Sequence, residues 1–185
     1  MNNARVFVVC GPVQHGKSTL ARWISATLGQ DFGDCSSVIY REVASRRGIT
    51  EAELRAMPKE DIRSDLIATG DDLCDPDPGF LAKQLYYGEA KRSIAGVRRR
   101  TELASLVEAV GDADVISIWI ERPDGPSISD NTDFGLKEAC PIHVANVGGV
   151  ASLRGIGEAI GQLQYRPECN LTFSPLGHSL SCQEV

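Results

Sequence analysis

The sequence predicts an α/β protein in which a parallel sheet lies between helices, giving three layers. Apolar segments that indicate buried strands alternate with segments whose apolar residues recur at helical spacing. Residues 115–120 are continuously apolar, which is typical of a parallel strand buried on both faces. A glycine-containing loop joins the first predicted strand to the first predicted helix. The 185 residues suit one domain with a sizeable core.

That loop carries the most specific motif in the chain. It follows an apolar strand at residues 5–10, reads G-x-x-x-x-G-K-S from Gly11 to Ser18, and leads into a helix over 17–29. This is the P-loop (Walker A) pattern, in which glycines let backbone N–H groups turn toward a polyphosphate. Lys17 adds a charge near the β- and γ-phosphates, and the Ser18 hydroxyl is a ligand for Mg²⁺. The motif predicts a P-loop NTPase fold that binds an NTP and Mg²⁺. The predicted phosphate-binding residues are Gly11, Val13, Gln14, His15, Gly16, Lys17, Ser18 and Thr19.

The segment between residues 30 and 87 reads as mostly helical. Its polar start indicates a loop, and the apolar spacing after it indicates short helices. The predicted elements are a loop at 30–37, a helix at 38–47, a short helix capped by Thr50 and Glu53, a helix at 59–69, turns at 69–72 and 75–79, and a helix through 80–86.

The second half of the chain continues the alternation of strands and helices. The predicted elements are a strand at 92–97, a helix through 103–110, the strand at 115–120, a polar loop at 121–134, a strand at 142–147 and a helix through 153–163. Residues 166–185 lose this periodicity and predict a flexible tail.

Composition narrows the classes of function. The formal net charge of −6 disfavours nucleic acid and anionic membrane as partners, although Arg98 to Arg100 form a local basic cluster. No signal pattern and no apolar run of about 18 residues is present, so we expect a cytoplasmic protein. The six cysteines include no C-x-x-C pair, which favours free thiols. Cys169, His178 and Cys182 are a weak candidate for a metal site.

A GTPase of the translation type shares the H-G-K-S-T-L letters of the loop, but the rest of the chain excludes it. No glycine has an aspartate three positions before it, so the D-x-x-G switch is absent. Of the five lysines, only Lys59 has an aspartate two residues on, and a proline precedes it, so N-K-x-D is absent as well.

If the protein is a kinase of a small phosphorylated molecule, a different set of residues is expected. It needs arginines that neutralise the transferring phosphoryl group, because catalysis there is mostly positioning and charge stabilisation. Arg63, Arg98 and Arg122 are candidates; the last two follow predicted strands, whose carboxyl ends line the ligand crevice of an open α/β sheet. Surface ion pairs are the alternative explanation for these arginines.

The segment G-V-R-R-R-T-E-L (96–103), the strand at 115–120 with Glu121-Arg122-Pro123 after it, Ser129-Asp130-Asn131, and the late strand ending at Asn146 together resemble the phage-type deoxynucleoside monophosphate kinases. These belong to the P-loop nucleoside-monophosphate-kinase type. The resemblance covers roughly residues 5–165. It implies a kinase domain at 1–165, with a helical acceptor-binding part at 36–87 and a short lid at 122–135.

The resemblance also implies roles for single residues. ATP is expected with its phosphates on residues 11–19 and its adenine against Asn146 and Val147. Lys17, Arg98 and Arg122 are the expected catalytic residues, and Ser18 is the expected Mg²⁺ ligand. The expected acceptor contacts are Arg63, Asp71, Asp72, Arg98, Arg99 and Glu102.

One departure from the wider pattern concerns Mg²⁺. Many P-loop kinases carry an aspartate at the end of the central strand, but here that place reads Ala95-Gly96-Val97. The acidic group is then expected from Asp71, Asp72 or Glu102, or else Ser18, water and phosphates hold the metal alone. Gly96 itself is explained by a substrate that approaches the backbone closely.

The function predicted in this way is transfer of the ATP γ-phosphoryl group to a deoxynucleoside monophosphate. The alternatives are a kinase of another small metabolite and a regulatory NTP-binding module with little turnover. Small-molecule nucleotides are the expected partners, without membrane or nucleic acid. The sequence leaves open whether the chain forms a homodimer. The expected location is the cytoplasm, that of the host if a phage encodes the chain.

Overall fold

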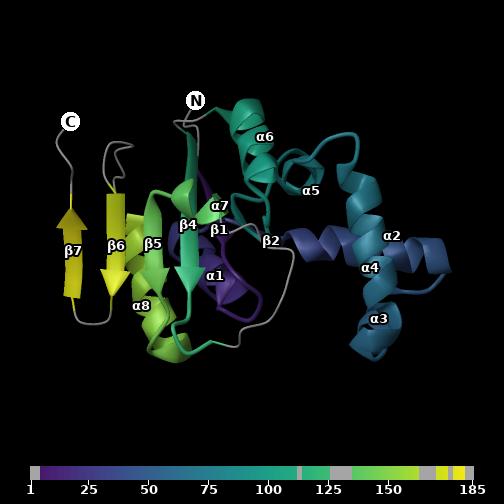
Figure 1. Cartoon of the computed structure of the whole chain (residues 1–185), viewed down its shortest axis with the longest axis horizontal. Coiled ribbons are helices and arrows are strands. Elements are labelled where there is room, and N and C mark those ends of the chain that lie inside the picture. Colours follow the sequence, from purple (N-terminus) through teal and green to yellow (C-terminus); the bar gives the residue numbers. More distant parts are fainter. Residues whose placement is uncertain (1–4, 112–113, 126–134, 163–169, 175–176, 182–185) are drawn as a thin grey trace.

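A twisted sheet runs through the middle of the computed structural model, which describes residues 5–111, 114–125, 135–162, 170–174 and 177–181 (Figure 1). The strand order is β2-β3-β1-β4-β5-β6-β7, and only the pairing of β7 with β6 is antiparallel. The predicted α/β architecture with a parallel sheet between helices is confirmed. The strands are β1 (Val6–Cys10), β2 (Phe32–Asp34), β3 (Ser93–Ala95), β4 (Val115–Glu121), β5 (Ile142–Ala145), β6 (Asn170–Ser174) and β7 (Gly177–Ser181).

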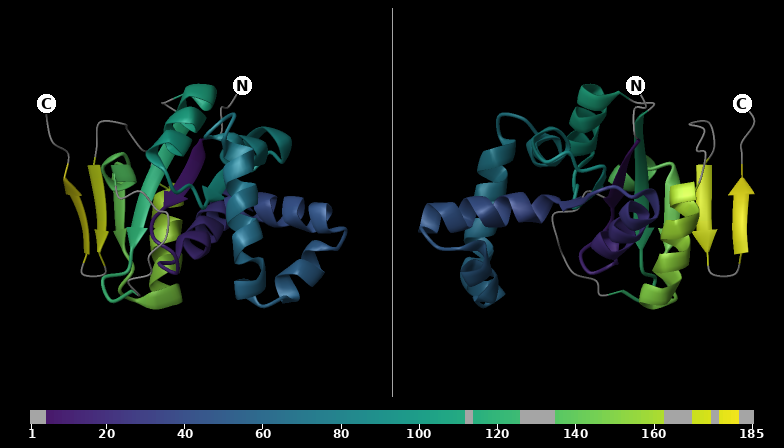
Figure 2. Two further views of the ribbon diagram at one scale, coloured as in Figure 1. Left: turned by 45° about the vertical axis from the view of Figure 1, so that its right-hand side comes forward. Right: turned by 180° about the vertical axis from the view of Figure 1, so that it is seen from behind.

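Helices cover both faces of this sheet. On one face, α1 (Lys17–Leu28) and α8 (Gly149–Gln162) pack side by side (Figure 2, right). The opposite face is covered by α5 (Phe80–Lys83), the π-helical turn η1 (Gln84–Gly88), α6 (Arg100–Val110) and α7 (Gly135–Glu138). The alternation of strand side chains divides the core accordingly: Phe7 and Val9 of β1 pack toward α1, while its other three residues pack toward α6.

Three further helices project from the β2 edge of the sheet, at the far end from β7 (Figures 1 and 2). They are α2 (Cys35–Arg47), α3 (Glu51–Ala56) and α4 (Lys59–Cys74), and they share a small core of Val43, Ala44, Leu54 and Ile62. The predicted capping box of α3 is present, with hydrogen bonds in both directions between Thr50 and Glu53.

Two predictions for this part of the chain are wrong. Residues 32–34 form β2 and Cys35 begins α2, where a loop over 30–37 was expected. Helix α4 continues through residues 69–72, where a turn was expected. Tertiary packing explains the second difference, because a side chain at Gly70 would come within 3.1 Å of Ile39 Cδ1 on α2. The glycine allows the two helices to approach instead of ending one of them.

The C-terminal segment also differs from the flexible tail predicted for residues 166–185. Residues 170–174 pair with β5 as β6, and residues 177–181 pair with β6 as β7. The open edge of β5 offers backbone hydrogen-bonding groups to any extended segment, so pairing there needs no strong side-chain periodicity. Among the described helices, none has the length and apolar character needed to cross a bilayer.

Candidate active site

The loop between β1 and α1, residues 11–16, is called the glycine loop. Gly11 has φ 139° and packs so closely on the end of β4 that a Cβ there would lie 2.1 Å from the Ile120 carbonyl oxygen. Gln14 and Gly16 also have positive φ, 66° and 103°. Glycine-containing loops with positive φ are typical of nests, in which backbone N–H groups bind an anion, so the glycine loop is a candidate nest.

The start of α1 adds to this site. No side chain caps its N-terminus, so its first N–H groups face the nest together with the positive end of the helix dipole. The Lys17 ammonium group donates to the Pro12 carbonyl oxygen at 2.6 Å, which folds its side chain over the glycine loop. Of the predicted phosphate-binding residues, Val13, Gln14, Lys17 and Ser18 line a common cleft, described below.

A carboxylate absent from the predicted site lies beside Ser18. The Ser18 hydroxyl donates to Asp34 Oδ2 at 2.6 Å, and Asp34 Oδ1 accepts from the amide and the hydroxyl of Ser36. Asp34 is thus both the last residue of β2 and the N-cap of α2. Its fixed rotamer holds one carboxylate oxygen at the first turn of α1.

Asp34 lies beside the end of β3, where an aspartate is absent from the sequence. It pairs with Ala95 across β2 and β3, and a Cβ on Gly96 would lie 3.3 Å from its Oδ1 and 3.2 Å from Cys35 Cβ. Gly96 also has φ 98°, a conformation that other residues rarely adopt. Gly96 therefore makes room for the β2–α2 junction. It also lines the cleft described below, so the expectation that a substrate approaches its backbone stays a prediction.

The pair of Ser18 and Asp34 fits Mg²⁺ by its chemistry. Both are oxygen donors, and Mg²⁺ in phosphate-binding sites combines one or two protein oxygens with water and substrate phosphates. Among the described residues, no group of three His, Cys, Asp or Glu side chains could hold a metal alone. Phosphate oxygens would have to complete the coordination. Cys169 and Cys182 of the weak metal candidate lie outside the described residues.

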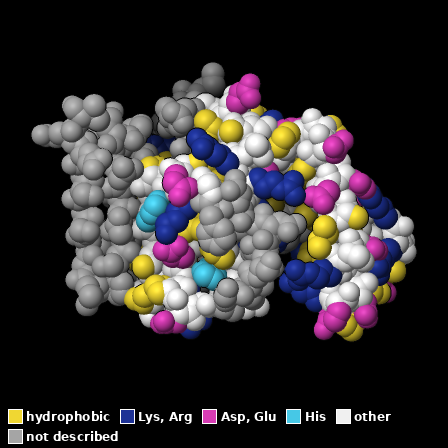
Figure 3. Space-filling model, viewed as in Figure 1, with side chains coloured by type: hydrophobic (Ala, Val, Ile, Leu, Met, Phe, Trp, Pro, Cys, Tyr) yellow, Lys and Arg dark blue, Asp and Glu magenta, His cyan; other side chains and the backbone are white. Residues whose placement is uncertain are grey.

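A cleft of about 480 Å³ opens next to these two residues, between the sheet and the projecting helices. Its floor is made by the glycine loop, Ser18 and Asp34, and one wall by the segment after β3 with Glu102 of α6. The opposite wall comes from α2, α3 and α4. Figure 3 shows Lys and Arg side chains at the boundary between the sheet and these helices.

The predicted acceptor residues separate into those that line the cleft and one that does not. Arg63, Asp71, Arg98, Arg99 and Glu102 all line it. Asp72 lies outside it, and its carboxylate pairs with Arg46 of α2 at 3.0 Å. Because α4 stays helical here, neighbouring side chains point about 100° apart. The prediction that Asp72 contacts the acceptor is therefore not supported.

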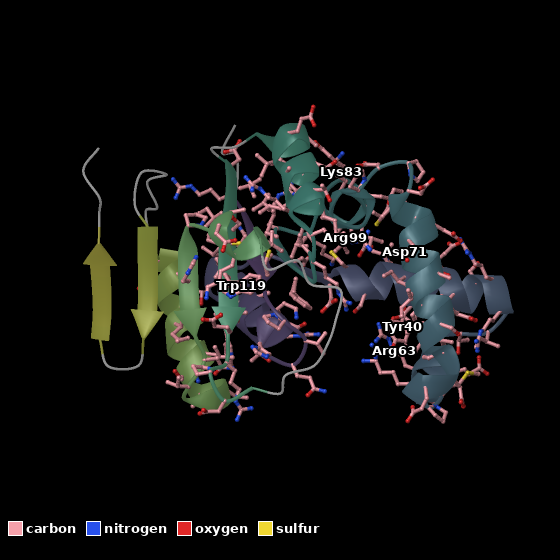
Figure 4. All side chains as sticks on the ribbon, in the orientation of Figure 1. Tyr40, Arg63, Asp71, Lys83, Arg99 and Trp119 are labelled. Atoms are coloured by element: carbon pink, nitrogen blue, oxygen red, sulfur yellow. The ribbon has the colours of Figure 1, made fainter. Side chains whose placement is uncertain are left out.

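Three of the candidate arginines carry unbalanced charge. Within the described residues, the guanidinium groups of Arg63, Arg98 and Arg122 form no ion pair, so surface ion pairs do not explain them. Arg99 differs, because it bridges the cleft to Asp71 of α4 at 3.1 Å (Figure 4). An anion that enters the cleft would meet Arg63 and Arg98 directly, whereas Arg122 is not among the residues that line it.

Glu102 is held against the same segment. Its Oε2 accepts from the Arg98 amide at 2.8 Å, and its side chain is only 14% exposed. Burial raises the pKa of Glu102, and the Arg98 amide together with the nearby guanidinium groups offsets only part of that effect. Glu102 therefore stabilises the turn that carries Arg98, and it also lines the cleft.

Several lining residues were missed by the sequence-based reasoning. Arg55 and Lys59 line the outer wall in addition to the predicted Arg63, and the three stand four residues apart along α3 and α4. The Arg55 charge is paired with Glu51 at 2.6 Å. The Arg55 guanidinium stacks on the ring of Tyr40, 4.1 Å from its centroid. The regular spacing of three basic residues was the signal in the sequence. Figure 4 shows Tyr40 and Arg63 close together on this wall.

Two cysteines line the cleft without offering a nucleophile. Burial raises the pKa of Cys35 and of Cys74, so both remain thiols at neutral pH. A covalent thiolate mechanism is therefore disfavoured for this site.

The predicted adenine-side residues lie on the other flank of the glycine loop. Val147 is 51% exposed, and Val150 beside it is 65% exposed, which leaves a small apolar surface at the start of α8. Asn146 is buried instead, and its side-chain amide donates to the His15 carbonyl oxygen at 3.1 Å. Asn146 supports the glycine loop in this arrangement, and Val147 is the residue free to meet a base.

His15 and the predicted lid need separate description. The His15 imidazole is 8% exposed and does not line the cleft, since it faces the turn at residues 122–125. Arg122 begins that turn, directly after β4. Most of the predicted lid at 122–135 lies outside the described residues.

Comparisons with known proteins give little to compare. No protein family matches the chain, and no curated protein does. Among solved structures, the chain is similar to an unliganded sugar kinase from Janibacter sp. HTCC2649, with a TM-score of 0.36 and 18% identity over 74% of this chain and 75% of that one.

Proposed function

We propose that the protein is a P-loop kinase that transfers the γ-phosphoryl group of ATP to the 5′-phosphate of a deoxynucleoside monophosphate. The observation that carries the proposal is the contact of Ser18 with Asp34 at the floor of the cleft. It joins the phosphate nest on one side to a basic cleft on the other. A donor site and an acceptor site thus share one boundary.

On the donor side, the glycine-loop amides and the α1 N-terminus would hold the ATP phosphates. Ser18 and Asp34 would hold Mg²⁺, directly or through water, and the bound metal would supply charge neutralisation on the phosphates. The apolar surface at Val147 offers a place for adenine.

On the acceptor side, the cleft has the volume of a small-molecule site and two basic walls. Arg98 and Arg63 face it from opposite sides, and neither is paired with a carboxylate among the described residues. A dianionic phosphate suits these charges, and the nucleoside would lie against Ile39, Tyr40 and Leu66 on the helical wall.

The chemical step needs positioning more than acid–base chemistry. An oxygen of the acceptor phosphate forms a bond to the γ-phosphorus while the bond from that phosphorus to the β–γ bridging oxygen breaks, leaving ADP. The acceptor oxygen is already anionic, so no general base is required. Lys17, Arg98 and Arg122 would neutralise charge on the transferring group and the two flanking oxygens.

A hydroxyl acceptor on another small metabolite is the second candidate. Asp34 favours it, because this carboxylate lines the cleft and is a suitable proton acceptor. A regulatory NTP-binding module is favoured by the absence of an aspartate at the end of β3. The Asp34 carboxylate beside that strand end weakens this alternative.

A coupled assay of ADP release tests the proposal. ATP and Mg²⁺ are combined with dAMP, dGMP, dCMP, dTMP or base-modified analogues, and in parallel with hydroxylated metabolites lacking phosphate. Turnover with one or more monophosphates and none without an acceptor supports the proposal. Turnover with hydroxyl acceptors alone would select the second candidate, and no turnover at all would leave the regulatory module.

A further inference from the structure

The His15 side chain is buried where three segments meet. Its Nδ1 accepts a hydrogen bond from the Arg122 amide at 2.9 Å, across 107 residues of sequence. Its own carbonyl oxygen accepts from Asn146 Nδ2 at 3.1 Å. One residue of the glycine loop is therefore bonded to the segments that follow β4 and β5.

The segment after β4 is shaped around this imidazole. The Gly125 amide donates to the Arg122 carbonyl oxygen at 2.8 Å, which closes a turn over residues 122–125. A Cβ on Gly125 would lie 2.8 Å from His15 Nε2 and 2.9 Å from Cε1. The turn thus lies directly against the ring, and its position depends on where the ring is.

We propose that His15 is a positioning residue that couples the glycine loop to Arg122. The inference rests on the proposed function, in which the loop holds the ATP phosphates and Arg122 neutralises the transferring group. Any adjustment of the loop on binding the phosphates is passed through the imidazole to the Arg122 backbone. The imidazole thereby keeps the position of the Arg122 backbone tied to that of the glycine loop.

The geometry specifies which atom does this. The Arg122 amide can only donate, so Nδ1 must be the unprotonated nitrogen of the ring. An asparagine at position 15 can place its Oδ1 near the position of Nδ1. A glutamine places its amide near Nε2 instead and leaves the Arg122 amide without an acceptor. H15N and H15Q are therefore a matched pair. H15N keeps an acceptor for the Arg122 amide, and H15Q does not.

Kinetics on this pair test the coupling. We expect kcat/KM for ATP to be about tenfold lower in H15Q than in H15N, the effect of one lost hydrogen bond to a buried donor, with the acceptor KM unchanged. R122A should lower kcat strongly in the H15N background and much less in H15Q, because H15Q already releases the Arg122 backbone and with it the position of the guanidinium group. Independent, multiplicative effects of H15Q and R122A would overturn the proposal, as would equal activity of H15N and H15Q.

A measurement without turnover separates this inference from the proposed function. ATP with MgCl2 is titrated into the ¹⁵N-labelled protein, and the Arg122 amide resonance is followed by NMR. The resonance should shift with ATP in wild type and H15N and stay fixed in H15Q. An unchanged response in H15Q would overturn the coupling. A shifting Arg122 amide in a protein inactive with every acceptor would instead overturn the proposed function and leave the coupling standing.

Discussion

Ser18 and Asp34 meet at 2.6 Å although they belong to different elements, the first turn of α1 and the end of β2. The register of β2 on β3 sets Asp34 opposite Ala95, and Gly96 leaves the space that the carboxylate needs. A serine hydroxyl in contact with a carboxylate supplies the oxygen donors that Mg²⁺ prefers, as the proposed function needs.

Removing the charge of Asp34 should weaken the use of Mg²⁺. In D34N we expect activity to fall about 10- to 100-fold and the Mg²⁺ concentration for half-maximal rate to rise, as for other changes close to a metal. Asparagine caps helices as well as aspartate does, so the unfolding midpoint should stay the same. A Mg²⁺ titration at fixed ATP measures the effect. D31N, whose carboxylate is exposed and 3.8 Å from Lys91, is the matched control, and equal Mg²⁺ dependence of the two variants would contradict the assignment.

Lys17 should contribute mainly to catalysis. K17A removes the one cationic side chain that reaches over the glycine loop, and we expect kcat to fall by about 10²–10³, the range for losing one preorganised charge-stabilising group. K83A is the comparison, because Lys83 pairs with Asp77 on another surface (Figure 4). Steady-state rates of both variants decide the point, and retained activity in K17A would remove Lys17 from the site.

The pairing of Arg99 with Asp71 predicts a competition. Asp71 holds the Arg99 guanidinium at 3.1 Å, so an anionic acceptor that binds Arg99 has to displace it. D71N should therefore lower the acceptor KM, by about two- to fivefold for a surface ion pair. The acceptor KM at constant ATP gives the answer. A raised KM would show that Asp71 itself contacts the acceptor, as the sequence-based prediction has it.

The charge of the buried Glu102 carboxylate should lower the stability of the folded protein at neutral pH. Burial raises its pKa above the unfolded value, so the folded state binds the proton more tightly. The wild type then gains stability as the pH falls and the carboxyl group is protonated, and loses it as the pH rises through the folded pKa. E102Q, which keeps an acceptor for the Arg98 amide, should have a higher free energy of unfolding than wild type at neutral pH.

Urea unfolding at several pH values checks this prediction. The difference between E102Q and wild type should shrink as the pH is lowered through the acidic range. A difference that stays constant with pH would mean that the charge of Glu102 is not what limits stability.

The strands and helices with strong periodicity could be predicted from the sequence, and they carry the donor half of the site. The continuously apolar β4 and the glycine loop between β1 and α1 are the clearest cases. The short strand β2 could not be predicted, because Phe32-Gly33-Asp34 has one large apolar residue and a glycine. β2 forms because it can pair with the open edge of β3. Because this strand was not predicted, Asp34 at its end was not recognised as a site residue.

The positions of the proposed acceptor-binding residues were harder to predict from the sequence, for a related reason. The helical boundaries around Gly70 and the direction in which Asp72 points depend on how α2 packs against α4, which local sequence does not encode. The role of His15 depends on a contact 107 residues away. Residues whose position follows from their own element were predictable, and residues placed by contacts between elements were not.

The central claim, that the γ-phosphoryl group of ATP is transferred to an acceptor phosphate bound in the cleft, is tested most directly by ³¹P NMR of a single reaction. The protein is mixed with ATP, Mg²⁺ and the four common deoxynucleoside monophosphates. The account predicts paired α and β resonances of one or more new deoxynucleoside diphosphates, growing in step with those of ADP and absent in K17A. Release of inorganic phosphate alone, or unchanged ATP, would contradict it.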